Sequence, residues 1–306
     1  MIVVFGAKGF IGTYLCDRLK QDGIPYWATD IDEVDISKQK DFDNLPQKDV
    51  DLVIHLACLQ PANVSEREYN PRNYISTNVI GTLNILDYCV GHNAKLIYFN
   101  SRKPVKGEYG LYAISERTAT ECVKYYNKNH ALKYIIFRLP PVYGYGCFTE
   151  IFQEGKPIKT GFQTFIDNAI QGKPLEVWGN AKVGRPIAYV KDVVNAIMYA
   201  LKSGNEGLYD LWTCKGLTLK QEVEAIVEVF ANGHKPKIIY QPDKQNSIEQ
   251  VYGLWDYSWL DTGWRPLYNF HEMLVDYKKE LESGRFNCLV QKRKAMFDEY
   301  YKNIVL

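Results

Sequence analysis

Ile2-Val3-Val4-Phe5-Gly6-Ala7-Lys8-Gly9-Phe10-Ile11-Gly12 is the stretch that decides the fold of this chain of 306 residues. Its apolar, β-branched start predicts a buried strand, and the residues after it predict a helix that Gly23 ends. The three glycines suit a tight turn, close backbone approach to a pyrophosphate, and packing of helix on strand. The free N–H groups at the helix start attract phosphate. We therefore predict a dinucleotide site formed by Gly6, Lys8, Gly9, Phe10, Ile11 and Gly12.

The composition indicates a globular protein with a sizeable core. The chain is 46% hydrophobic and 24% charged, its net charge is +1, and charges of one sign form no long block. Nothing therefore favours a nucleic acid or a membrane as partner. The seven cysteines show no metal-ligand spacing, so we expect reduced thiols and no metal site. With a strand predicted from residue 2 and no long apolar run, we expect a cytoplasmic protein without a signal peptide.

An acidic residue ends the second predicted strand, residues 25–30. Asp30 lies eighteen residues beyond Gly12, where a ribose-binding carboxylate belongs. A carboxylate there accepts hydrogen bonds from both ribose hydroxyls and repels a 2′-phosphate, which favours NAD over NADP. The positive charge of Lys8 in the loop would instead favour NADP. Asp32 is the alternative ribose ligand, and a solvated strand end is the alternative reading of Asp30.

Strands and helices alternate after this point, and alternation predicts a parallel sheet covered by helices on both faces. Small Ala57 would let a cofactor lie against the backbone at the carboxyl end of its strand. The predicted strands are 51–58, 95–101, 133–139 and 207–212, and the predicted helices are 72–91, 111–129 and 192–201.

The later part of the chain predicts a smaller lobe interleaved with the sheet. Glycines and prolines follow residue 143, whereas residues 187–190 again read as a core element. We predict an α/β fold with a Rossmann-type doubly wound parallel sheet. The NAD-binding domain comprises 1–147 and 187–214, and the substrate lobe comprises 148–186 and 215–306. Thr218 should cap a helix over 219–230, and the charged tail from His271 should be helical with a solvated face.

Seven motifs in one order resemble the extended short-chain dehydrogenase/reductase family, which contains nucleotide-sugar epimerases, dehydratases and 4-keto-sugar reductases. The resemblance covers most of the chain. Its motifs are Gly6-x-x-Gly9-x-x-Gly12, Asp35-Ile36, His55-Leu56-Ala57, Asn78-Val79-Ile80-Gly81-Thr82, Arg138-Leu139-Pro140-Pro141-Val142-Tyr143-Gly144, the segment from Arg185 to Asp192, and Gly263-Trp264-Arg265-Pro266.

The resemblance implies NAD as cofactor and a nucleotide sugar as substrate. Arg185 would bind the sugar-nucleotide pyrophosphate, and Tyr143 and residues 61–72 would touch substrate. A homodimer would form through the helices over 72–91 and 111–129. The implied cofactor contacts beyond the glycine loop and Asp30 are Asp35, Ile36, Leu56, Ala57, Cys58, Asn78 and Pro140.

The implied catalytic residues are Ser101 and Tyr112, but the family's lysine, four residues after the tyrosine, is Glu116 here. That lysine lowers the phenol pKa from about 10, whereas a carboxylate on the same helical face raises it. Glu116 should therefore slow proton transfer, although it could accept hydrogen bonds from a ribose.

Two functions follow from Glu116. In the first, Lys103, Lys106 or Arg117 replaces the lysine in an NAD-dependent nucleotide-sugar epimerase, dehydratase or reductase. A shift of one residue would place Arg117 at the lysine position and Ala113 at the tyrosine position. In the second, the protein binds a dinucleotide and regulates without turnover. The sequence specifies neither the sugar nor the nucleotide.

Overall fold

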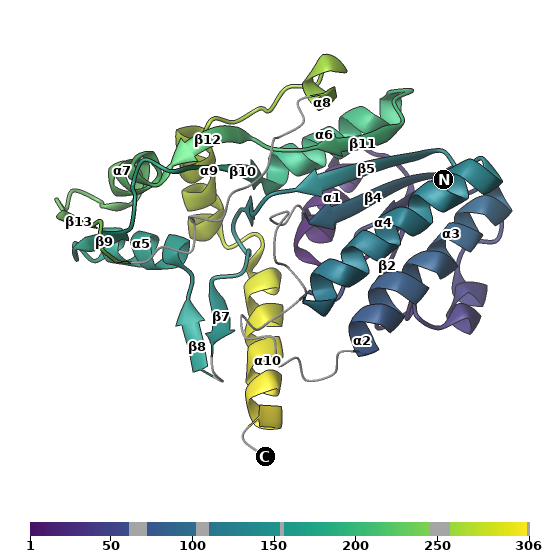
Figure 1. Ribbon diagram of the computed structural model, residues 1–306, viewed down its shortest axis with the longest axis horizontal. Helices are drawn as coiled ribbons and strands as arrows, with labels where there is room; N and C mark the ends of the chain where they lie inside the picture. Colours follow the sequence, from purple (N-terminus) through teal and green to yellow (C-terminus); the bar gives the residue numbers. More distant parts are fainter. Residues whose placement is uncertain (61–71, 102–109, 154–155, 245–257, 305–306) are drawn as a thin grey trace.

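A parallel six-stranded sheet forms the centre of the molecule in the computed structural model, which describes residues 1–60, 72–101, 110–153, 156–244 and 258–304 (Figure 1). Its strand order is β11-β5-β4-β3-β1-β2. This order confirms the predicted doubly wound parallel sheet. The strands are β1 (Ile2–Phe5), β2 (Tyr26–Thr29), β3 (Leu52–His55), β4 (Lys95–Ser101), β5 (Tyr134–Leu139) and β11 (Gly207–Asp210).

Helices cover both faces of this sheet, as a buried parallel sheet requires. The alternation of β1 shows it directly: Val4 belongs to the core under α1 (Phe10–Gln21) and α6 (Val190–Lys202). Val3 and Phe5 belong to the opposite core, under α3 (Gly81–His92) and α4 (Leu111–His130) (Figure 1). All three side chains are completely buried.

The predicted helix over 72–91 is interrupted by a wider turn. It comprises α2 (Arg72–Tyr74), the π-helix η2 (Ile75–Ile80) and α3. A π-turn carries one extra residue, and such turns often occur at functional sites. Asn78 lies in this turn.

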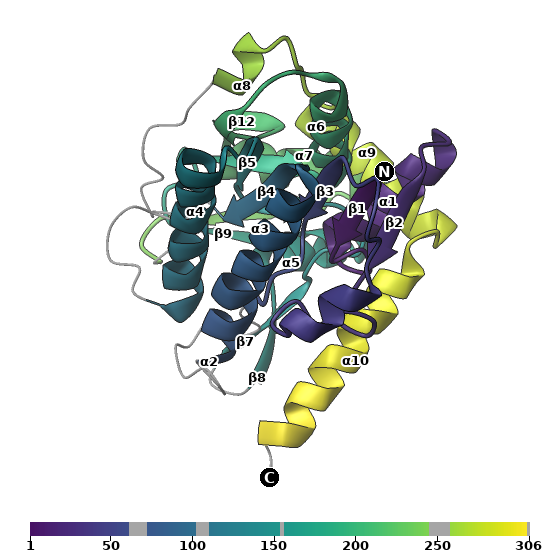
Figure 2. The ribbon, with the colours of Figure 1, turned by 90° about the vertical axis from the view of Figure 1, so that its right-hand side faces the viewer.

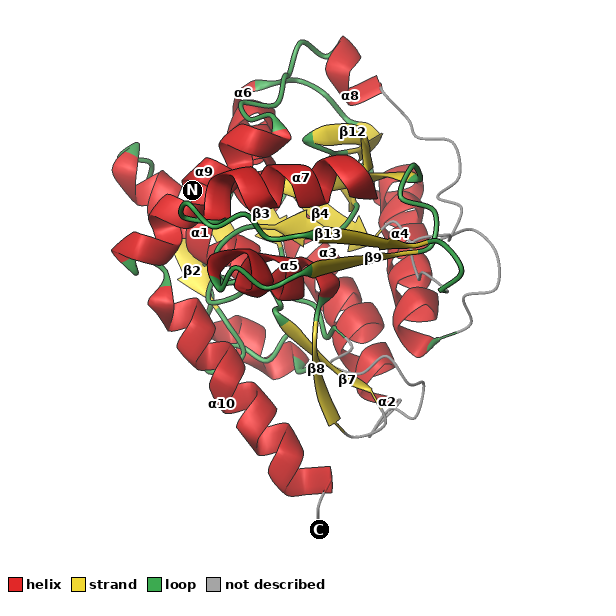
Figure 3. Cartoon of the chain, turned by 90° about the vertical axis from the view of Figure 1, so that its left-hand side faces the viewer, coloured by secondary structure: helices red, strands yellow, loops and turns green. Residues whose placement is uncertain are grey.

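Three smaller sheets and further helices lie outside the central sheet. Figure 3 shows α5, α7, β9 and β13 in front of the central sheet. Residues 187–190 are buried as core, but β10 pairs with β6 and β12 instead of the central sheet. The sheets are β12 (Cys214–Thr218) with β10 (Gly184–Tyr189) and β6 (Val142–Tyr143), β13 (Ile238–Gln241) with β9 (Leu175–Trp178), and β7 (Glu150–Gln153) with β8 (Lys156–Lys159). The remaining elements are η1 (Gln39–Asn44), α5 (Gly161–Ile170), α7 (Leu219–Phe230), α8 (Ser258–Asp261), α9 (Phe270–Ser283) and α10 (Asn287–Ile304).

Local sequence signals set several helix ends. Gly23 has a φ of +66° directly after α1, so the prediction that it ends this helix is confirmed. Thr218 caps α7 in a reciprocal capping box with Gln221, as predicted. Among the described residues, no helix is both long and apolar enough to span a bilayer.

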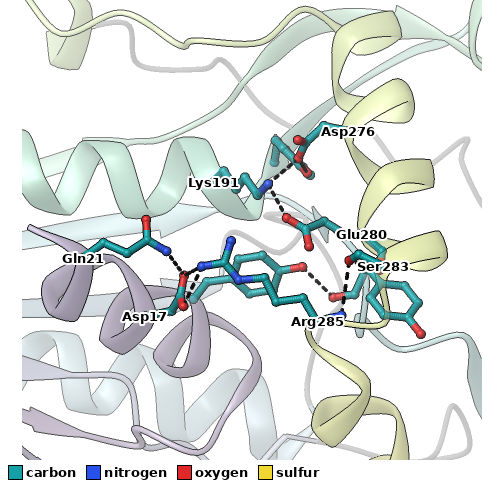
Figure 4. Close-up of polar contacts among 10 residues, drawn as sticks. Asp17, Gln21, Lys191, Asp276, Glu280, Ser283 and Arg285 are labelled. Carbon is teal, nitrogen blue, oxygen red and sulfur yellow. Dashed lines mark hydrogen bonds and ion pairs between the residues drawn. The ribbon is translucent and has the colours of Figure 1, made fainter.

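The charged tail is helical and most of its described charged side chains are exposed, as expected, but some of them pair with the body of the protein. Lys191 of α6 lies 2.7 Å from Asp276 and 2.6 Å from Glu280 of α9, so these charges tie α9 to α6 (Figure 4). Arg285, between α9 and α10, lies 2.7 Å from Asp17 of α1 (Figure 4). Paired charges of opposite sign explain why acidic and basic tail residues face the body of the protein.

His55, at the end of β3, makes stability depend on pH. The residue is 1% exposed, and its Nε2 lies 3.1 Å from the Thr82 hydroxyl. Burial lowers the pKa of His55 to about 3. The unfolded chain takes up this proton below a pH of about 6.5 while the folded chain does not, so stability falls as the solution is acidified.

We expect His55 to remove about 1.4 kcal/mol of the free energy of unfolding between a pH of about 7.5 and 5.5. Urea unfolding of wild type and of His55→Gln at these two pH values measures the change in the free energy of unfolding. The variant should lose that much less on acidification, and equal losses would contradict the assignment.

Candidate active site

The glycine loop depends on contacts between backbones that leave no room for a Cβ atom. Gly6 has a φ of +80°, and a Cβ there would lie 2.6 Å from the Ala57 nitrogen. A Cβ on Gly12 would overlap the Gly6 carbonyl and lie 2.8 Å from the Ala7 Cα. At Gly9, by contrast, a Cβ would meet only the Gly6 oxygen, at 3.1 Å, so this position is open to a ligand. The loop therefore fits a pyrophosphate at the start of α1.

Asp30 lies beside this loop at the end of β2. Its Oδ2 accepts a hydrogen bond from the Lys8 backbone N–H at 2.7 Å. The Lys8 ammonium is directed elsewhere, to Asp32 at 3.2 Å and Glu33 at 2.8 Å. Lys8 is thus engaged by two other carboxylates, which weakens its support for NADP. Asp32, the alternative ribose ligand, forms part of that exposed ion pair.

The other residues predicted to contact a cofactor lie around the same edge of the sheet. Leu56, Ala57 and Cys58 directly follow β3, and buried Pro140 directly follows β5. Parallel strands end at one edge, where the ligand crevice of such folds lies. Asp35 accepts hydrogen bonds from the backbone and hydroxyl of Ser37, whereas Ile36 is buried against Gly81.

Asn78 is occupied by contacts within the protein. Its Oδ1 accepts from the Leu59 N–H at 2.8 Å, and its Nδ2 donates to the Leu59 carbonyl and the Ser115 hydroxyl, each at 3.1 Å. These bonds join the end of β3 to the π-turn and to α4. The structure therefore gives Asn78 a positioning task, and its contact with a cofactor stays a prediction.

Four predicted residues meet in one cluster where β3 and β4 end and α4 begins. Ser101 ends β4, and its hydroxyl hydrogen-bonds Tyr112 in the first turn of α4. Glu116, one turn later, is 4% exposed. Its Oε1 accepts from the Cys58 thiol at 3.3 Å and its Oε2 from the Ser101 backbone N–H at 3.2 Å. The carboxylate is thus built into the site.

This environment opposes ionisation of the phenol. Burial, and then the negative charges that Cys58 and Glu116 can carry, raise the pKa of Tyr112 well above its usual 10, whereas the Ser101 hydroxyl lowers it. The direction agrees with the expected effect of Glu116, but burial is the largest cause. Burial and Glu116 also raise the pKa of the Cys58 thiol.

Of the groups considered as replacements for the lysine, Arg117 is exposed on α4, next to buried Glu116. The buried Glu116 side chain therefore belongs to the cluster with Tyr112, and exposed Arg117 does not; that Glu116 takes the place of the family's lysine stays a prediction. Ala113, the tyrosine position in the shifted alignment, is buried and has no functional group. Lys103, Lys106 and residues 61–71 lie outside the described residues.

Arg185 and Tyr143, the predicted substrate ligands, contact each other. Arg185 donates to the Tyr143 hydroxyl and lies 2.8 Å from Glu222 of α7. The Glu222 side chain is completely buried, so this is an internal ion pair. Tyr143 also stacks on Phe162, with ring centroids 4.2 Å apart. Binding of a sugar-nucleotide pyrophosphate by Arg185 stays a prediction, and it would have to compete with Glu222.

Sequence reasoning missed the partners of these residues. No local pattern indicates that Glu222 faces Arg185, 37 residues away in the chain. The thiol of Cys58 was expected to contact a cofactor, but not to donate to Glu116 from 58 residues away. Glu116, four residues after Tyr112, was visible in the sequence, and it was the signal that indicated this cluster.

Comparison with known proteins gives the class of the molecule. Residues 2–211 match the sequence model of the NAD dependent epimerase/dehydratase family. The chain therefore belongs to this family, and its resemblance to the extended short-chain dehydrogenases/reductases is confirmed. The match also bears out NAD as cofactor.

Particular relatives extend the similarity over nearly the whole chain. A putative UDP-glucose 4-epimerase of Methanocaldococcus jannaschii is 25% identical, over 87% of this chain and 93% of its own. The fold is similar to that of the UDP-glucose 4-epimerase of Thermotoga maritima with UDP-glucose, with a TM-score of 0.72 at 21% identity, covering 92% of this chain and 99% of that one. The Thermus thermophilus UDP-glucose 4-epimerase in complex with NAD has a TM-score of 0.67 at 21% identity, covering 90% and 96%.

The Gly12→Ala substitution tests the loop geometry. We expect a loss of about 1–3 kcal/mol of the free energy of unfolding, because the new methyl group overlaps the backbone of residues 6 and 7. Gly91→Ala is the matched control, since its Cβ would meet nothing within 4 Å inside α3. The control should be neutral or stabilising by up to about 1 kcal/mol in urea unfolding. Equal effects of the two substitutions would contradict the tight turn.

Proposed function

We propose that this protein is an NAD-dependent oxidoreductase of nucleotide sugars whose site favours reduction of a carbonyl over oxidation of a hydroxyl. The observation that carries the proposal is the buried carboxylate of Glu116 beside Tyr112, held by Cys58 and Ser101. Family membership supports the general reaction class.

The residues would divide the work as follows. The glycine loop and Asp30 would hold the dinucleotide, which when bound supplies or accepts a hydride. Ser101 would hydrogen-bond the reacting oxygen of the sugar. Tyr112 would give a proton to that oxygen, and Glu116 would keep the phenol protonated until it does so. We also propose the division into an NAD-binding domain of 1–147 with 187–214 and a substrate lobe of 148–186 with 215–306.

The preferred direction follows from the protonation state of Tyr112. Oxidation of a hydroxyl needs the phenolate as base, and each unit by which the pKa rises makes the phenolate tenfold rarer at neutral pH. Reduction needs the phenol as acid, and a protonated Tyr112 is present in nearly every molecule. The alkoxide formed during reduction is a strong base that can take this proton.

Turnover in the two directions tests the proposal. Absorbance at the NADH band is followed with NADH and UDP-, GDP- or dTDP-4-keto sugars, and with NAD and the corresponding sugars. Wild type should be faster in reduction. Tyr112→Phe should lower that rate by about 10²- to 10⁴-fold, because the proton donor is lost.

Glu116→Lys should raise the oxidation rate at least about tenfold, because a cation favours the phenolate. Glu121→Lys makes the same charge change on the exposed face of α4 and should alter neither rate. Faster oxidation than reduction by wild type would contradict the proposed direction.

A second candidate is a regulatory protein that binds NAD without turnover. The bonds from Cys58 and Ser101 to Glu116 favour it, because they fit a carboxylate. Saturable NADH binding without turnover in either direction, together with activity in Glu116→Lys, would support this candidate.

We further propose a cytoplasmic homodimer that pairs through α3 and α4. Exposed apolar side chains on these helices and the preceding turn support it, among them Ile80, Val90 and Tyr125. Sedimentation of a single monomeric species would contradict the dimer.

A further inference from the structure

The helix α10 packs directly against the glycine loop, although about 280 residues separate them in the sequence. In its first turn Leu289 is buried against Gly146. One turn later the Lys292 ammonium donates to the Lys8 carbonyl at 3.2 Å and lies 3.8 Å from Asp30. Figure 2 shows α10 running past the side of the molecule where β1, β2 and the helix α1 lie. This helix therefore borders the proposed cofactor site.

Several contacts fix the start of α10. Arg285 pairs with Asp17 of α1 at 2.7 Å, and Asp17 also accepts a hydrogen bond from Gln21 (Figure 4). Phe286 stacks on Tyr14 of α1 with ring centroids 3.9 Å apart. Because both contacts reach the helix that begins at the glycine loop, α10 and the loop keep one relative position.

Arg293 of α10 carries a positive charge that no carboxylate among the described residues neutralises. Its guanidinium lies 3.8 Å from the ring centroid of Phe148 and 5.5 Å from that of Phe10, the first residue of α1. Its Nη1 is buried without a hydrogen-bond partner. Within the described part of the chain, no carboxylate pairs with it.

A buried cation without an anion is costly, and folded proteins rarely keep one without a reason. Burial lowers the pKa of Arg293 to about 10, so the group still carries its charge at neutral pH. Two aromatic faces stabilise a guanidinium but use none of its N–H donors. The described part of the chain supplies no such partner, which points to an anion that accepts hydrogen bonds and belongs to a bound ligand.

The position of Arg293 indicates which anion fits. Phe10 directly follows Gly9, where the loop is open, and the start of α1 presents free N–H groups and a positive dipole. A guanidinium matches phosphate oxygens with its planar fork of donors. We propose that Arg293 is a further ligand of the cofactor pyrophosphate, supplied by the C-terminal helix.

This proposal rests on the dinucleotide site of the proposed function, and ligand binding tests it without turnover. Dissociation constants of NAD and ADP are measured by isothermal titration calorimetry, and adenosine, which has no phosphate, by NMR titration. Arg293→Met should raise the dissociation constants of NAD and ADP by about 10- to 100-fold, the effect expected for loss of a charge-assisted hydrogen bond. It should change the dissociation constant of adenosine by less than about twofold. The affinity of Arg293→Lys for NAD and ADP should lie between those of wild type and Arg293→Met. Lys294 is an exposed neighbour on α10, and Lys294→Met should bind both ligands as wild type does.

The thermal midpoint without ligand separates a ligand from a structural support. Replacing this partly buried charge, which has no carboxylate partner among the described residues, by an apolar chain should leave the midpoint of Arg293→Met unchanged or raise it. A lower midpoint together with equal weakening of ADP and adenosine would show that Arg293 only supports the loop, and would overturn the proposal. Wild-type affinity of Arg293→Met for NAD and ADP would overturn it as well.

The two proposals fail in different ways. If wild type binds neither NAD nor ADP, the dinucleotide site itself is refuted. If wild type binds both and Arg293→Met binds them equally well, only the role of Arg293 is refuted.

Discussion

The close contact between backbones at Gly6 and Gly12 is the constraint on which the molecule depends. It lets β1 turn sharply beside β3 and lets α1 start directly above the turn. The same contact leaves the first N–H groups of α1 uncovered, because no side chain of the loop lies over Gly9. Packing of the core and access of a phosphate to the start of α1 thus depend on the same close backbone contact. A methyl group at Gly12 would disturb both.

Glu116 is a second constraint, because it is one of the groups that raise the pKa of Tyr112. It lies on α4, the helix that carries Tyr112. Its two carboxylate oxygens accept hydrogen bonds from Cys58, which follows β3, and from the backbone N–H of Ser101, which ends β4. In the proposed function the carboxylate would act on the phenol from these two strand ends, while the dinucleotide would lie at the glycine loop. On the proposed function, such a site would bind its dinucleotide well while its proton transfer favours one direction.

Much of the fold was predictable because its signals are local. Apolar runs placed β1, β3, β4 and β5 within a few residues, and Gly23 and Thr218 marked two helix ends. The π-turn at Asn78 was not predictable, because the apolar spacing of residues 72–91 also fits a regular helix.

The candidate site was predictable where its residues belong to motifs, and it was missed where distant side chains meet. The partners Arg185 and Glu222, and the contact of α10 with the glycine loop, depend on how the two parts of the chain pack. Arg293 looks in sequence like any other basic residue of a charged helix. Only the structure shows that two aromatic rings and no acid among the described residues surround it.

The central claim is that residues 2–12, with Asp30, form an NAD site, and calorimetric titration of the wild-type protein with NAD and with NADP tests it most directly. The account predicts one saturable site per chain for NAD and affinity at least about tenfold weaker for NADP, because Asp30 repels the 2′-phosphate. No saturable heat with NAD, or tighter binding of NADP, would contradict it.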